Sequence, residues 1–137
     1  MDALVLEQIV VEGPDDKEVI EHIINNVPKE KFTNMYGKTK NLKELAELIS
    51  KSEIFLCSDS APLHIGVALG VRTFVIFGST DDNKLIPQNA LITPIKAANC
   101  KCQLRPCLWE KRKTTCKELD CLKISSDDIV KTLLFGQ

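Results

Sequence analysis

An aspartate, a serine and a histidine stand close together in the stretch SDSAPLHIGVALG, residues 58–70. Asp59 can accept hydrogen bonds from sugar hydroxyls. Ser60 and Ala61 are small enough to let a phosphate approach the start of a helix, where backbone N–H groups point outward. His64 comes one helical turn later and can face the same ligand. These residue types at this spacing favour a site for a sugar phosphate.

Each of these residues also has a purely structural interpretation. Asp or Ser before a helical pattern most often serves as an N-cap, so Asp59 or Ser60 could do no more than that. A lone histidine such as His64 is more often a partly buried, hydrogen-bonded residue of the core. The occurrence of all three at one strand end is what favours ligand binding.

The segments around this stretch predict a parallel sheet. The apolar run over residues 54–57 is typical of a strand buried on both faces. Pro62 suits the first turn of a helix that Gly70 closes. A second buried-strand pattern follows over residues 73–77. Ligands of open parallel sheets bind beyond the carboxyl ends of the strands, where the turn at Asp59 lies.

Other segments continue the alternation of strands and helices. The patterns predict strands over residues 8–11 and 31–36, helices after Asp16 and Asn41, and a closing helix over residues 127–134 capped by Ser125 or Ser126. Such alternation predicts an α/β fold with a parallel sheet flanked by helices. A chain of 137 residues with 44% apolar residues is the size of one domain, so we expect a single domain over residues 1–137.

Composition limits the classes of partner. The net charge is −1 and no long run of like charges occurs, which argues against nucleic acid. No apolar run approaches the roughly 20 residues that span a bilayer, and no secretory signal is evident, so we expect a cytoplasmic protein.

Five of the six cysteines lie in an irregular, cysteine-rich loop over residues 99–121: Cys100, Cys102, Cys107, Cys116 and Cys121. The loop has no CxxC pair, so its spacing is a poor match to ordinary zinc sites. We expect free or partly oxidised thiols, with a zinc site as the less favoured alternative. The sixth, Cys57, is expected to pack within its strand.

Three motifs carry a resemblance to a known family. DSAPLHI (59–65), ALGV (68–71) and FGSTD (77–81) resemble the C-terminal half of glycosyltransferase family 9, the heptosyltransferases of lipopolysaccharide core assembly. The family's usual form is D-S/T-G-x-x-H, A-L-G-V-P and F-G-P-T-D. The resemblance extends over nearly the whole chain.

The resemblance implies a Rossmann-like domain of a GT-B glycosyltransferase that holds a nucleotide-activated sugar, typically ADP-heptose. It places Asp59 on the sugar and His64 against the sugar or phosphate. The turn formed by Ser60, Ala61 and Leu63 would hold the diphosphate.

Weaker assignments and departures accompany this resemblance. Asp15 would lie near the ribose, or is an ordinary N-cap, and Lys40 would flank the base, or is a solvated surface lysine. Ala61 replaces the glycine of the phosphate turn, which is tolerable only if its φ is negative. Arg72 and Ser79 each replace a usual proline.

The family's N-terminal half, which binds the acceptor and supplies the general base, has no counterpart in these residues. We therefore expect a donor-binding half that does not transfer sugar efficiently alone and requires no cofactor. Its partners would be a nucleotide sugar and an acceptor domain or a second copy of the chain. The acceptor would bring it near the inner face of the cytoplasmic membrane. The alternative is a stand-alone, non-catalytic nucleotide-binding or assembly module.

Overall fold

The computed structural model describes residues 8–11, 13, 15–88, 91–103, 105–107 and 116–136. Contacts within the chain divide it into two compact units, Met1–Leu45 and Ala46–Gln137. Each unit is described by itself below. The expectation of a single domain over residues 1–137 stays a prediction.

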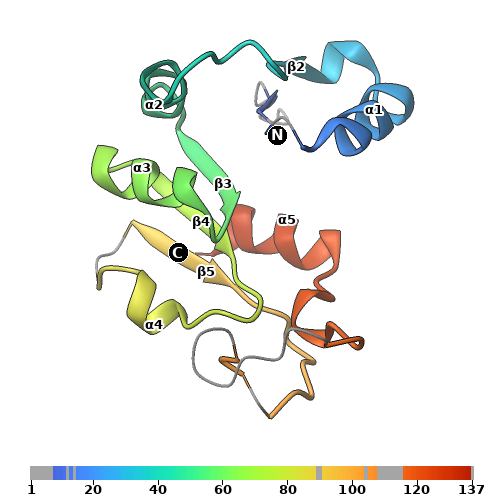
Figure 1. Ribbon diagram of the computed structural model, residues 1–137, viewed down its shortest axis with the longest axis vertical. Helices are drawn as coiled ribbons and strands as arrows, with labels where there is room; N and C mark the ends of the chain where they lie inside the picture. Colours follow the sequence, from blue (N-terminus) through green and yellow to red (C-terminus); the bar gives the residue numbers. More distant parts are fainter. Residues whose placement is uncertain are drawn as a thin grey trace. The chain divides into compact units, whose positions relative to one another are not determined.

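The first unit contains a small parallel βαβ arrangement. Strand β1 (Gln8–Val10) pairs in parallel with β2 (Phe32–Asn34), and helix α1 (Lys17–Asn26) and the single 3₁₀ turn η1 (Lys29–Lys31) connect them (Figure 1). Ile20 of α1 is fully buried. This arrangement confirms the strand, helix and strand predicted for this part of the sequence.

Helix α1 begins after a tight turn that Asp16 holds. Asp16 occupies the N-cap position, and its carboxylate accepts a hydrogen bond from the N–H of Gly13 (3.0 Å). Asp15 precedes it with an exposed side chain. The N-cap interpretation of Asp15 is therefore wrong, because the neighbouring aspartate takes that position.

Helix α2 (Leu42–Ser50) begins with a reciprocal cap, and the boundary between the two units falls within it. Asn41 Oδ1 accepts a hydrogen bond from the N–H of Glu44 (3.0 Å), and Glu44 Oε2 accepts one from the N–H of Lys40 (2.8 Å). These bonds satisfy N–H groups that the first turn of a helix leaves unpaired. The predicted cap at Asn41 is confirmed.

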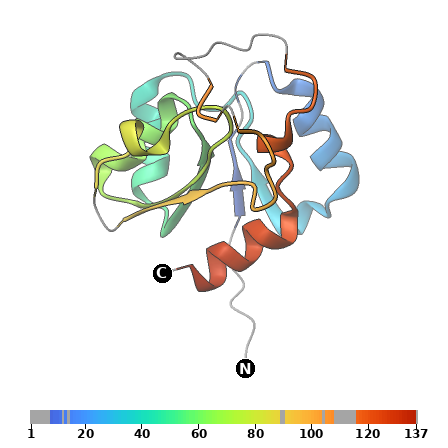
Figure 2. The same cartoon turned by 90° about the horizontal axis from the view of Figure 1, so that it is seen from below.

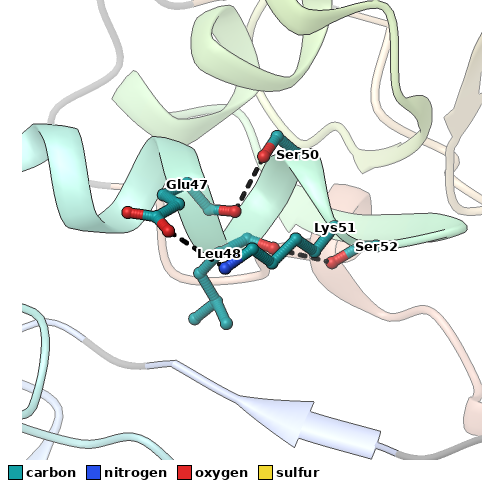
Figure 3. A network of polar contacts seen from close by, with 5 residues as sticks. All are labelled: Glu47, Leu48, Ser50, Lys51 and Ser52. Atoms are coloured by element: carbon teal, nitrogen blue, oxygen red, sulfur yellow. Dashed lines mark hydrogen bonds and ion pairs between the residues drawn. The ribbon is translucent and has the colours of Figure 1, made fainter.

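The end of α2 is closed by short side chains that return to the backbone (Figure 3). Ser50 Oγ donates to the carbonyl of Glu47 (2.8 Å), and Ser52 Oγ donates to that of Leu48 (3.3 Å). Lys51 Nζ also contacts the Glu47 carboxylate at 3.0 Å. The chain then turns directly into the sheet of the second unit.

The second unit is built on three parallel strands. Strands β3 (Ile54–Ser58), β4 (Arg72–Ile76) and β5 (Ile92–Ile95) lie in the order β3-β4-β5. Helix α3 (Ala61–Leu69) connects the first two and the short helix α4 (Asp82–Leu85) precedes the third, while the 3₁₀ turn η2 (Asp120–Leu122) and α5 (Ser126–Phe135) follow. The expected parallel α/β fold with flanking helices is confirmed.

Helices α3 and α5 cover opposite faces of this sheet (Figures 1 and 2). On the α3 face, Leu63 packs with Val75, Phe77 and Ile92 in a buried cluster, which Cys57, Val67, Leu85 and Ile86 surround. Cys57 thus packs within the core, as predicted.

The α5 face carries Arg72 and the fully buried Phe74, because alternate residues of a strand point to one side. The Arg72 guanidinium lies 5.2 Å from the centre of the Phe74 ring and donates to the carbonyl of Gly136 (2.8 Å), next to the end of α5. An arginine in place of the family's usual proline therefore ties the sheet to the closing helix.

Two features of the sheet differ from the prediction. Strand β3 is not buried on both faces, since Leu56 is 40% exposed. Strand β5 was not predicted, because Pro94 disrupts its pattern. The carbonyls of Leu91 and Ile95 face β4, so the nitrogen of Pro94 faces away from β4 and no ladder bond is lost.

Helix α3 ends and helix α5 begins at the residues predicted from the sequence. Gly70 adopts a left-handed φ of 67° after α3, and the N–H of Val71 donates to the carbonyl of Gly66 (3.1 Å). Ser125 caps α5 through a hydrogen bond from the N–H of Asp128 (3.1 Å). Among the helices of the described ranges, none has the length and apolar character needed to cross a membrane.

Candidate functional site

The carboxyl ends of the three parallel strands meet at one edge of the second unit. Ser58 pairs with Ile76, which pairs in turn with Ile95, so these strand ends are aligned. Asp59 follows β3 directly, Phe77 follows β4, and the chain leaves β5 at the same edge. This is the edge at which open α/β sheets bind ligands.

Ser60 occupies the N-cap position of α3 but does not cap the helix. Its side chain accepts no hydrogen bond from the first turn, and its hydroxyl instead donates to the carbonyl of Ser58 (3.3 Å). The Ser58 hydroxyl donates to Ser60 Oγ (3.4 Å). The interpretation of Ser60 as a capping side chain is therefore wrong.

The side chains of Asp59 and His64 hold no element of the described structure in place. Asp59 is half-buried and His64 is exposed on α3, and neither side chain has a hydrogen bond or ion pair within the described part of the chain. The interpretation of His64 as a buried core histidine is wrong, because Leu63 and not His64 faces the core. The interpretation of Asp59 as a cap also fails, since Ser60 holds that position.

The first turn of α3 offers few backbone donors. Pro62 has no N–H, and the N–H of Leu63 donates to the carbonyl of Ser60 (3.0 Å). The N–H of Ala61 has no intrahelical carbonyl to bond. Ala61 is not among the residues of positive φ, so the condition for replacing glycine there is met. The side chain of Leu63 is fully buried, so any contact it makes with a ligand is through its backbone.

Cys57 is the next-to-last residue of β3, just before this turn, and its thiol is unreactive. Burial, and to a smaller extent the Asp59 carboxylate, raise the pKa of the Cys57 thiol to about 12. The thiol therefore holds its proton at neutral pH and is no nucleophile.

The turn after β4 uses its polar groups differently. Asp81 Oδ1 caps α4 by accepting a hydrogen bond from the N–H of Asn83 (3.1 Å), and Thr80 is buried. The carbonyl of Ser79 accepts a hydrogen bond from the N–H of Cys107 (3.0 Å). Gly78 packs so closely on Leu122 that a Cβ there would lie 2.6 Å from its Cδ2.

The two remaining residues predicted for the nucleotide lie in the first unit. Asp15 is exposed in the turn before α1, and Lys40 is exposed before α2 with its N–H bonded to Glu44. The Lys40 side chain has no partner among the described residues, which agrees with a solvated surface lysine.

All six cysteines are described, and all are free thiols. Within the described ranges, no group of three or more histidine, cysteine or acidic side chains is arranged to hold a metal ion. The cysteine-rich loop forms no helix or strand in its described parts before η2, and part of it (104 and 108–115) lies outside the described residues.

Sequence reasoning missed three charged residues at the same edge. Lys96 follows β5 and forms an ion pair with Asp82 (2.8 Å), and Arg105 lies in the cysteine-rich loop near both. The strand before Lys96 was not predicted, so nothing in the sequence pointed to its position.

Comparisons with known proteins agree with this architecture. The profile of glycosyltransferase family 9 (heptosyltransferase) matches residues 6–116. Lipooligosaccharide heptosyltransferase 2 of Campylobacter jejuni is 30% identical over 86 residues, which cover 61% of this chain and 27% of that protein. Lipopolysaccharide heptosyltransferase 3 of Escherichia coli K12 is 35% identical over 71 residues, covering 50% and 20%.

A solved structure shares the fold. The E. coli ADP-heptose lipopolysaccharide heptosyltransferase II superimposes with a TM-score of 0.58 at 19% identity, over 66% of this chain and 28% of that one. The chain thus spans about a quarter of the length of the relatives it matches.

Proposed function

Because the chain belongs to glycosyltransferase family 9, we propose that it binds the nucleotide-activated sugar of a heptosyltransferase. ADP-heptose is the proposed donor, and a lipopolysaccharide-type glycolipid is the proposed acceptor. This proposal rests on the turn between β3 and α3, whose residues match the family's motif.

One observation carries the proposal. At the ligand-binding edge of the sheet, the side chains of Asp59 and His64 form no hydrogen bond within the described part of the chain, and Ser60 bonds only to its neighbour Ser58 and does not cap α3. Polar side chains that contribute little to folding, gathered at such an edge, are available for a ligand.

Each residue has a proposed role toward the donor. Asp59 accepts hydrogen bonds from sugar hydroxyls. The N–H of Ala61 donates to the diphosphate, and the Ser60 hydroxyl does so by exchanging its bond to the Ser58 carbonyl for one to the ligand, with the positive end of the α3 dipole behind them. His64, one turn further along α3, donates to a phosphate or sugar oxygen. Asp15 and Lys40 are proposed to contact the ribose and the base.

In the transfer itself, the bond between the anomeric carbon and the diphosphate breaks as an acceptor hydroxyl forms the new glycosidic bond. Donors around the diphosphate stabilise the charge that develops on this leaving group. The hydroxyl must lose its proton to a general base within hydrogen-bond reach. We propose that an acceptor-binding domain supplies this base, that no metal cofactor is required, and that transfer takes place at the inner face of the cytoplasmic membrane.

Calorimetric titration of the chain with ADP, UDP, GDP and ADP-sugars tests the donor site. We expect preference for the adenine nucleotide, and weaker binding by Asp59→Ala and His64→Ala. Asp81→Ala and His22→Ala are matched controls, because Asp81 caps α4 and His22 lies on α1. No binding at millimolar concentration, or equal losses in the controls, would contradict the proposal.

A second assay tests whether this chain binds the donor while a separate acceptor-binding domain supplies the general base. Sugar transfer is measured for the chain alone and with the acceptor-binding domain of a family 9 relative added. We expect turnover only in the mixture. Efficient transfer by the chain alone would show that the base lies within it.

A further inference from the structure

Two cysteines of the cysteine-rich loop, separated in the sequence, lie at the turn after β4. Cys121 is buried, and its sulfur lies 3.9 Å from the position that a Cβ of Gly78 would take. The N–H of Cys107 donates a hydrogen bond to the carbonyl of the next residue in this turn, Ser79 (3.0 Å). Both cysteines are therefore packed on one short turn.

Cys100 reaches the same turn from the end of β5. It lines a cavity of about 370 Å³ whose walls also include residues 80–83, and its side chain is half-buried. Cys102 and Arg105 line the same cavity. Small reagents from solvent can reach a thiol in such a wall, whereas they cannot reach a buried thiol such as that of Cys121.

The pKa of the Cys121 thiol reports on its neighbours. Burial raises this pKa, and of the other cysteines Cys100 raises it further, with a smaller contribution from Cys107. Arg105 acts in the opposite direction. Electrostatic effects weaken with distance, so Cys100 is the better placed of the two cysteines to react with Cys121. Cys102 lines the same cavity as Cys100 but is not among the groups that shift this pKa.

We propose that Cys100 and Cys121 form a reversible disulfide, with a small-molecule disulfide such as oxidised glutathione as the oxidant. The accessible Cys100 thiol loses its proton to solvent and attacks one sulfur of the oxidant, which forms a mixed disulfide and releases one small thiol. Cys121 then loses its proton, attacks the Cys100 sulfur and releases the second small thiol. Two thiols of the chain are oxidised while one small disulfide is reduced to two thiols.

The new bond would link two ends of the cysteine-rich loop. It joins the residues that follow β5 to η2, which precedes α5. A cross-link that closes roughly 20 residues stabilises a folded chain mainly by restricting its unfolded state. The link involves no residue of the proposed donor site and does not depend on the proposed function.

Equilibration of the reduced 137-residue chain in glutathione buffers of increasing disulfide content, with a chelator present, tests this pair. Alkylation of the remaining thiols, proteolysis and mass spectrometry identify the linked cysteines. We expect two peptides joined through Cys100 and Cys121, which excess reduced glutathione separates again. The melting temperature of the oxidised chain should exceed that of the reduced chain by about 5–10 °C.

Three variants assign the roles of the thiols. Cys100→Ser should abolish both the cross-link and the rise in melting temperature. Cys121→Ser should instead accumulate glutathione on Cys100, because the thiol that completes the exchange is missing. Cys102→Ser is the matched control, because Cys102 is also half-buried and lines the same cavity, and it should retain the cross-link.

Several results would overturn this assignment. A disulfide that joins Cys121 to Cys107, or Cys100 to Cys102, would show that a different pair reacts. Loss of the cross-link in Cys102→Ser as well as in Cys100→Ser would contradict the special position of Cys100. A chain that keeps all its thiols reduced in oxidised glutathione alone would exclude the exchange altogether.

Discussion

The turns after β3 and after β4 stand side by side at one sheet edge but treat their polar residues in opposite ways. After β4, Asp81 caps a helix and Ser79 anchors the cysteine-rich loop through its carbonyl. After β3, Asp59 has no partner in the described chain, and Ser60 does not cap α3. The polar groups of the β4 turn stabilise neighbouring elements, whereas the Asp59 carboxylate of the β3 turn remains available for a ligand.

This difference teaches that a residue's type before a helix does not reveal its role. Both turns place an aspartate close to a helix start, and a capping interpretation is reasonable for each. Only the hydrogen bonds separate them, since Asp81 accepts from Asn83 and Asp59 accepts from no described residue. Variants that weaken ligand binding without lowering stability, or that lower stability without weakening binding, therefore test this contrast.

The largest effect is expected from Leu63→Ala. Leu63 anchors the β3 turn and α3 to the core and is fully buried. Its truncation should lower the free energy of unfolding by about 2–5 kcal/mol, from lost burial and the cavity left behind. Urea denaturation measures this, with the more exposed Leu69→Ala as control. Similar losses in both variants would show that the turn is not fixed through Leu63.

Asp59→Asn should separate binding from folding. The substitution preserves shape and removes the charge, so we expect donor affinity to fall about ten-fold while the free energy of unfolding changes by less than about 0.5 kcal/mol. Calorimetry and urea denaturation on the same preparation measure the two quantities. A clear loss of stability with unchanged affinity would reverse the role assigned to Asp59.

Asp81→Ala should give the opposite result. Loss of the cap on α4 should lower the free energy of unfolding by about 1 kcal/mol and leave donor affinity unchanged. Asp81→Asn is the control, because asparagine also caps helices well and should retain most of the stability. If Asp81→Ala weakened ADP binding as much as Asp59→Asn, the two turns would share one role.

The smallest effect near neutral pH is expected at Cys57, which precedes the β3 turn. Its thiol has a pKa of about 12 in the folded chain and 9.0 as the reference value for the unfolded chain. Both states are protonated below pH 8, so the unfolding free energies of the chain and of Cys57→Ala should run parallel there. Above pH 9 the Cys57 thiol loses its proton in the unfolded state but keeps it in the folded state. The unfolding free energy of the chain should therefore fall relative to that of Cys57→Ala as pH rises. Parallel curves up to pH 11 would contradict the raised pKa.

Much of the fold could be predicted from the sequence because local signals agreed with the packing. Asn41, Gly70 and Ser125 end or begin helices where the pattern placed them. Strand β5 was not predicted because Pro94 argues against a strand. Proline is tolerated only where its nitrogen faces away from the neighbouring strand, and the sequence does not show that Pro94 lies at such a position. The exposure of Leu56 was not predicted because an apolar run does not show which parts of a sheet's faces the helices leave uncovered.

The candidate site could be predicted less completely. The DSAPLHI motif placed Asp59 and His64 at the sheet edge, but the orientation of the Ser60 hydroxyl depends on backbone geometry that residue types do not specify. Arg105 and Lys96 meet in one cavity although they come from separate segments. A single sequence carries no signal for such a long-range meeting.

Pro94 has a further consequence for how the molecule behaves at high concentration. Its nitrogen faces the open side of β5, where it offers no hydrogen-bond donor to a strand of another molecule. Unprotected edges of this kind invite intermolecular pairing and aggregation. The residue that hid β5 from sequence analysis thus also makes that edge a poor template for self-association.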